Sequence, residues 1–174
     1  MMGLCIKFFL HILFPLLLIT SAHSSSLENL SDGKFRGSGF IRTEPDKPLE
    51  KFSCRLEKKP SKNVEQLEFS GKCATATLKG RVKFKIDVIE PKKRYRLEVR
   101  IFGDGRLEAH VYEGMDIGGK RVRFTSGIEF NGEKYASVIN VDYSRNHIHK
   151  ISEIVTSNAS GKSFKMFELI TKVE

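Results

Sequence analysis

Alternation of apolar and polar residues with a period of two is the feature that most constrains what this chain can fold into. It is clearest between residues 81 and 88, where every second residue is apolar. The apolar positions are Val82, Phe84, Ile86 and Val88, and the charged positions between them are Arg81, Lys83, Lys85 and Asp87. Since successive side chains of a strand point to opposite faces, this pattern predicts a β-strand with one buried face and one charged face.

The same period recurs along most of the chain after residue 34. The strands that it predicts lie near residues 35–41, 52–56, 64–73, 82–88, 95–101, 107–111, 122–124, 135–143, 148–154 and 164–173. Turn sequences separate several of them, among which are Asp104-Gly105, Asn131-Gly132 and residues 158–161. Regular spacing without a helical stretch predicts an all-β domain of about 9–10 short strands, either an antiparallel up-and-down barrel or a sandwich.

The interior of such a domain has two possible states. Small closed barrels either fill their interior with side chains or hold one small ligand. The predicted inward positions are mostly Phe, Leu, Ile and Val, and we expect Leu107, Ala109 and Val111 to form the apolar face of their strand. A packed core and a cavity for an apolar ligand both stay open.

The beginning of the chain has the order of a secretory signal peptide. Lys7 precedes an apolar stretch from Phe8 to Ile19, and small residues follow it. This stretch is shorter than the roughly 20 apolar residues of a membrane-spanning helix. We therefore expect residues 1–24 to be a cleaved signal peptide, residues 25–33 a flexible polar lead-in, and residues 34–174 a single domain without a membrane span, periplasmic or secreted.

Export changes how the cysteines are interpreted. Loss of the leader would remove Cys5 and leave Cys54 and Cys73 in an oxidising compartment, where disulfides persist. We expect these two to be bridged, with two buried free thiols as the alternative. In the chain-entropy model such a bridge is worth about 3 kcal/mol.

The chain is strongly basic, with 30 Lys and Arg against 21 Asp and Glu and a formal net charge of +9. The two neighbouring strands near 81–88 and 95–101 would place a set of basic side chains on one outer face, and this set is the predicted anion-binding site. Its members are Arg81, Lys83, Lys85, Arg94 and Arg96. The candidate partners are an anionic lipid, lipopolysaccharide, a glycan or an acidic protein, and nucleic acid is not expected outside the cytoplasm. The alternative is that these charges only keep the outer face of a sheet soluble.

Other chemistry has little support in the sequence. His147 and His149 would share one face of a strand and are weak candidates for metal ligands, which His110 or Asp142 would have to complete. No Gly-x-Ser-x-Gly nucleophile motif occurs. We expect no cofactor and no enzymatic activity.

Several short motifs resemble those of a group of small exported proteins of alphaproteobacteria. The motifs are Phe35-Arg36-Gly37-Ser38-Gly39, Cys54-Arg55, Cys73-Ala74 and Gly80-Arg81-Val82, within residues 33–100. The opening aromatic residue is usually Trp in that group and is Phe35 here. The resemblance implies an exported β-barrel-like domain with a Cys54–Cys73 bridge, and it implies no activity. The segment Gly33-Lys34-Phe35 is also similar to the Gly-x-Trp of lipocalins, without the Trp.

Three functions follow as expectations. The first is a non-enzymatic binding or structural protein of a bacterial envelope, whose basic face docks an anionic component. The second is a carrier that holds a small apolar ligand inside a barrel. The third is a secreted effector that acts on a host protein.

Overall fold

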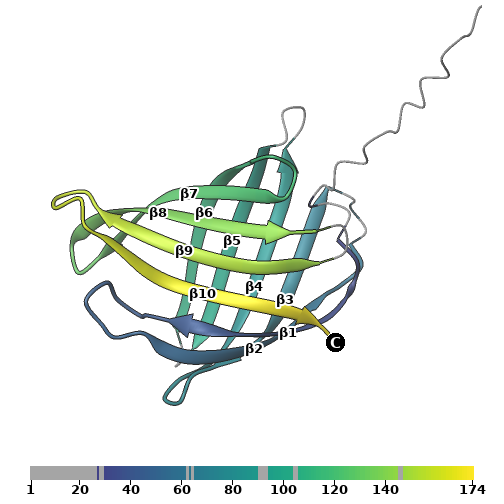
Figure 1. Cartoon of the computed structure of the whole chain (residues 1–174), viewed down its shortest axis with the longest axis horizontal. Coiled ribbons are helices and arrows are strands. Elements are labelled where there is room, and N and C mark those ends of the chain that lie inside the picture. Colours follow the sequence, from purple (N-terminus) through teal and green to yellow (C-terminus); the bar gives the residue numbers. More distant parts are fainter. Residues whose placement is uncertain are drawn as a thin grey trace, which may run out of the picture.

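The computed structural model describes residues 27, 30–61, 63, 65–89, 94–103, 106–144 and 147–174, so the predicted signal peptide and the Asp104-Gly105 turn lie outside the described residues. The described part of the chain contains ten strands and is all-β. They are β1 (Gly33–Ile41), β2 (Glu50–Lys58), β3 (Gln66–Ala74), β4 (Lys79–Ile89), β5 (Arg94–Gly103), β6 (Arg106–Asp116), β7 (Arg121–Phe130), β8 (Glu133–Tyr143), β9 (Ile148–Ser157) and β10 (Ser163–Val173). Each strand pairs antiparallel with the next, and β1 pairs with β10 to close the barrel (Figure 1). The predicted fold class is confirmed, in its up-and-down barrel form.

The barrel is flattened into two layers. Figure 1 shows β3–β6 running steeply behind, while β7–β10 with β1 and β2 run across in front of them. The layers join where β2 meets β3 and where β6 meets β7. The second junction is short, because β6 and β7 share only four register pairs.

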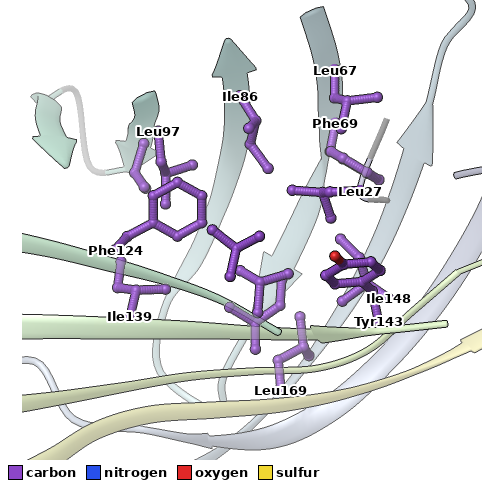
Figure 2. Packing of buried hydrophobic residues seen from close by; sticks show 14 of the residues in the cluster. Leu27, Leu67, Phe69, Ile86, Leu97, Phe124, Ile139, Tyr143, Ile148 and Leu169 are labelled. Carbon is purple, nitrogen blue, oxygen red and sulfur yellow. The ribbon is translucent and has the colours of Figure 1, made fainter. Parts of the chain in front are cut away.

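Alternate side chains of both layers meet in a large apolar cluster inside the barrel, and a smaller cluster contains Tyr135, Val155 and Met166. Figure 2 shows Leu67 and Phe69 of β3 and Leu97 of β5 on the side opposite Leu169 of β10. Phe124 is fully buried in the large cluster. The buried faces are those that the period of two predicted for most strands.

The segment before β1 also contributes to the core. Leu27 is fully buried and Leu30 is nearly so, and both belong to the apolar cluster. Figure 2 shows Leu27 near Phe69 and Ile148. This differs from the expected flexible lead-in over residues 25–33, because these two leucines are apolar enough to pack into the barrel.

The predicted disulfide is confirmed. Cys54 of β2 and Cys73 of β3 are register partners and are bonded through their sulfur atoms. The bridge therefore fixes the pairing of β2 with β3 at one of the junctions between the two layers.

The prediction for β6 was wrong. Leu107, Ala109 and Val111 point outward, and Leu107 is 57% exposed. The phase of β6 is set further along the strand, at Gly114, whose position beside Phe124 leaves no room for a side chain: a Cβ there would lie 2.4 Å from Phe124 Cδ1. Since Gly114 faces the interior, the other even-numbered residues of β6 face the same side. The odd-numbered residues Leu107, Ala109 and Val111 therefore face out.

Two predicted turns are confirmed. Asn131 and Gly132 join β7 to β8 with positive φ angles of 50° and 82°, the backbone conformation that an Asn-Gly hairpin turn requires. The turn at residues 158–161 joins β9 to β10 and ends at Gly161, with a φ of 69°.

Candidate functional site

Four basic residues form a row across the outer wall of the barrel. Arg36 on β1 is the register partner of Arg55 on β2, Arg55 is the partner of Lys72 on β3, and Lys72 is the partner of Arg81 on β4. Register partners lie on the same face of a sheet, and all four side chains are exposed. We call these four residues the basic row.

The outer wall is hollowed beneath the basic row. One hollow of about 1030 Å³ is lined by all four residues together with Lys79, and by Phe102 and Leu107 at its apolar end. A second hollow of about 700 Å³ is lined by the same four residues and by Lys34 and Lys83. Since the two share the basic row and Phe102, they form one basic groove.

The centre of the basic groove is not neutralised by the protein itself. Arg36 is paired with Glu174, and Lys83 lies 3.1 Å from a carboxylate oxygen of Glu68. In the described part of the chain, no carboxylate lies within ion-pair distance of Arg55, Lys72 or Arg81. Like charges that stand opposite one another on neighbouring strands destabilise a sheet, so an anion bound here would relieve their repulsion.

The structure places the five predicted anion-binding residues on the outer wall of β4 and β5. Arg81 belongs to the basic row and Lys83 lies at its border. The other three stand beside carboxylates: Lys85 Nζ is 3.2 Å from Asp87, Arg94 is 3.9 Å from Glu113, and Arg96 is the register partner of Asp87. The basic-row residues without a carboxylate partner among the described residues are therefore Arg55, Lys72 and Arg81, of which only Arg81 belongs to the predicted set.

Arg55 and Lys72 were missed, although the sequence contains a signal for them. They flank the two cysteines, as Cys54-Arg55 and Lys72-Cys73. If the bridged cysteines are opposite one another on antiparallel strands, the residue after the first must stand opposite the residue before the second. The predicted disulfide thus implies an Arg55–Lys72 pair.

A cluster of polar side chains, separate from the basic groove, lies inside the barrel. Glu153 of β9 points inward, because its register partners are Ile139 and Phe167. Ser137 Oγ donates a hydrogen bond of 2.6 Å to Glu153 Oε1, and Tyr112 OH donates one of 3.3 Å to the same oxygen. Nothing in the sequence indicated this cluster, because Glu153 lies in a strand marked mainly by its isoleucines.

The electrostatics of this cluster follow from its burial. Desolvation raises the pKa of Glu153, and the hydrogen bonds from Ser137 and Tyr112 and the nearby His110 oppose that rise. Desolvation and the charge of Glu153 raise the pKa of Tyr112. Neither hollow on the outer wall is lined by these residues, so the cluster contributes to the interior and not to the basic groove.

The two predicted metal candidates are close to one another. The rings of His147 and His149 have centroids 4.1 Å apart. Desolvation lowers the pKa of His147, and the charge of the neighbouring His149 imidazole lowers it further. Across the described residues, no group of three or more His, Cys, Asp or Glu side chains is placed to hold a metal ion. The pair alone supplies too few ligands for a zinc site.

No family model, curated protein or solved structure matches this chain. Where the structure describes the chain, no helix has the length and hydropathy needed to cross a membrane. Support for a function therefore comes from the surface chemistry of the barrel, in which the basic groove is the most distinctive feature.

Proposed function

We propose that this chain is an exported, non-enzymatic binding protein that docks on the phosphate groups of anionic lipids, including lipopolysaccharide, in a bacterial envelope. The observation that carries the proposal is the basic row, in which four cations stand side by side on four strands and three have no carboxylate partner among the described residues.

The spacing of the row suits several phosphates at once. Neighbouring strands lie about 4.8 Å apart, so the row extends over roughly 15 Å of the outer wall. The guanidinium groups of Arg55 and Arg81, on either side of Lys72, can each bind a phosphate through two parallel hydrogen bonds. A surface that carries many phosphates would satisfy this row better than a single small anion.

The apolar end of the groove favours a lipid over other polyanions. Phe102 and Leu107 are register partners, both are exposed, and both line the groove beside Arg81. A glycan offers little that would cover these two side chains. An anionic amphiphile offers a charged head group for the row and acyl carbon atoms for the apolar end.

The test is co-sedimentation with vesicles that contain phosphatidylglycerol, against neutral phosphatidylcholine vesicles, at low and at high salt. The variant Arg55→Glu with Lys72→Glu is expected to bind at least roughly 30-fold more weakly, because each basic residue near an anionic membrane is worth about 1 kcal/mol. The matched control is Lys120→Glu with Lys134→Glu, which makes the same change in net charge at two exposed lysines that do not line the groove.

Two results would overturn the proposal. One is an equal loss of binding in the control, which would make net charge and not the groove the cause. The other is binding to neutral vesicles as strong as binding to anionic ones.

A further inference from the structure

Where β6 and β7 diverge, β6 has a stretch of edge with which no strand of the described part of the chain pairs. β6 pairs with β7 only from Glu113 to Asp116, whereas it pairs with β5 along its whole length. Within the described part of the chain, no strand pairs with Leu107–Tyr112 on the side that faces β7. Instead of a ladder of backbone hydrogen bonds, this stretch accepts a hydrogen bond of 2.8 Å at Val111 O from the side chain of Ser126 on β7.

The direction of that hydrogen bond shows which backbone groups are exposed at the edge. In an antiparallel strand, the N–H and C=O of one residue point to the same side, and the side alternates along the strand. Since Val111 O points toward β7, the backbone groups of Leu107 and Ala109 point to that side too. These groups form a short template for another strand.

The side chains along this edge are unusual for an exposed strand. Proteins protect such edges with lysine, proline, bulges or very short strands. The stretch 107–112 contains no lysine and no proline, and its outward residues are Leu107, Ala109 and Val111. Leu107 is 57% and Val111 is 42% exposed. The outer face of this edge is therefore apolar, and the one carboxylate of the stretch, Glu108, lies on the opposite face. An apolar outer edge of this kind favours pairing with another strand.

We propose that this edge pairs with the same edge of a second copy of the chain, antiparallel and centred on Ala109. That register places Ala109 opposite Ala109 of the second copy, and Leu107 opposite Val111. Each of these residues presents its N–H and C=O to the partner strand, so the paired residues exchange backbone hydrogen bonds. The two barrels would then share one continuous sheet through their β6 strands.

The polar residues of the stretch fit the same register. Glu108 and His110 face the interior side of β6, because their partners on β5 are Ile101 and Val99. Pairing centred on Ala109 places Glu108 of each copy opposite His110 of the other, so a carboxylate faces an imidazole N–H that can donate a hydrogen bond to it. In this register the Leu107–Val111 pair on the outer face and the Glu108–His110 pair on the inner face each occur twice, once on either side of Ala109. This match favours a second copy of the chain over an unrelated strand.

The oligomeric state of the mature, disulfide-bonded protein tests the proposal. Sedimentation equilibrium over a range of concentrations is expected to show a dimer that dissociates on dilution. Val111→Lys places two lysines in the interface, and we expect it to weaken the dimer by about tenfold or more. Ile154→Lys, at an outward position of β9 that is paired on both sides, is the matched control and leaves the dimer intact.

A cysteine at the two-fold axis gives a second, independent measurement. The Cα atoms of hydrogen-bonded register partners lie about 5.5 Å apart, within the range of a disulfide. Ala109→Cys is therefore expected to form a covalent dimer on oxidation. Ala136→Cys is the control, because Ala136 is exposed on β8 between Gly127 and Thr156 of the neighbouring strands.

The proposal is overturned if the wild-type chain stays monomeric at every concentration, or if Ala109→Cys cross-links no faster than Ala136→Cys. Leu107 belongs to both surfaces, but Ala109 and Val111 do not line the basic groove, so the two substitutions leave its lining unchanged. Vesicle binding by the oxidised and the reduced Ala109→Cys variant separates the two proposals, because this substitution leaves the net charge and the groove lining unchanged.

Discussion

Arg55 of β2 and Lys72 of β3 stand opposite one another on the outer wall, and in the described part of the chain neither has a carboxylate within ion-pair distance. Their neighbours in the same row, Arg36 and Arg81, are also cations. Side chains opposed in this way repel one another and lower the stability of the sheet. A binding role for the row explains why such an arrangement is present.

Lys72→Glu separates stability from binding. The new carboxylate would stand between Arg55 and Arg81, so we expect the free energy of unfolding in urea to rise by about 0.2–1 kcal/mol while binding to anionic vesicles falls. Lys134→Glu is the control, because Lys134 is the register partner of Glu129 and its replacement creates a pair of like charges. A lower stability of Lys72→Glu would contradict the repulsion that we infer within the row.

Removal of the bridge with Cys54→Ala and Cys73→Ala is expected to lower the free energy of unfolding by about 3 kcal/mol. The sequence separation of 19 residues sets this value in the chain-entropy model. Urea unfolding of the variant checks it, and wild-type protein unfolded with a reductant serves as the reference. Two free thiols in denatured, unreduced wild-type protein would contradict the bridge itself.

Two glycines in strands are expected to respond differently to the same substitution. At Gly39 a Cβ would lie 1.7 Å from the backbone oxygen of Glu168, so Gly39→Ala must push β1 away from β10. At Gly127 no atom lies within 4 Å of such a Cβ. We expect Gly39→Ala to lower the melting temperature strongly and Gly127→Ala to leave it unchanged or slightly higher, since alanine costs less conformational entropy by about 0.5–1 kcal/mol. Equal effects would show that β1 and β10 are less closely paired than described.

The buried carboxyl group of Glu153 predicts a pH dependence of stability. Desolvation raises its pKa in the folded chain. As the pH rises from the pKa of the unfolded chain to that of the folded chain, ionisation of this group therefore lowers the free energy of unfolding. The free energy of unfolding of Glu153→Gln, taken relative to the wild type, should therefore increase as the pH rises from acid to neutral. Urea unfolding at a series of pH values measures this difference.

Glu133→Gln is the control with the opposite sign. Hydrogen bonds from Ser157 and Tyr135 lower the pKa of Glu133 in the folded chain, so its contribution is present at neutral pH and is lost as the pH falls. The disadvantage of Glu133→Gln relative to the wild type should shrink toward acid pH. Parallel pH profiles for the two variants would contradict the environments described for both carboxylates.

Leu27 tests whether the segment before β1 belongs to the domain. Leu27→Ala removes a fully buried side chain, and substitutions of this kind cost about 2–5 kcal/mol. Leu78→Ala is the control, because Leu78 is 40% exposed and its loss should cost about 0.5 kcal/mol or less. If both variants unfold at the same urea concentration as the wild type, Leu27 does not contribute to the core.

The sequence predicted the strands and missed what depends on contacts between distant strands. The period of two located most strands, because each has one face in the core and one in water. It failed at β6, where the contact of Gly114 with Phe124 sets the phase and where the interior residues include Glu108 and His110. The predicted disulfide implied the Arg55–Lys72 pair, but the complete basic row runs across four strands, and the register of β1 and β4 is needed to add Arg36 and Arg81.

Register also shifts where no residue pattern announces it. Irregularities lie between Asp142 and Tyr143 on β8 and between Lys165 and Phe167 on β10. They change which residues of β9 oppose which neighbours, and they leave Glu153 inside and Ile154 outside. From the sequence alone, isoleucine is the better candidate for the interior.

The pairing of β1 with β10 makes the ring of strands depend on the order in which the chain is synthesised. Phe35 is the register partner of Val173, so β1 cannot complete its pairing until a residue 138 positions later has been synthesised. Cys54 of β2 and Cys73 of β3 are only 19 positions apart, so the β2–β3 hairpin can form long before that. Local hairpins thus come first and closure comes last. A nascent chain that stalls before β10 would leave β1 and β9 as two bare edges, which is the form of this protein most exposed to aggregation and to proteases.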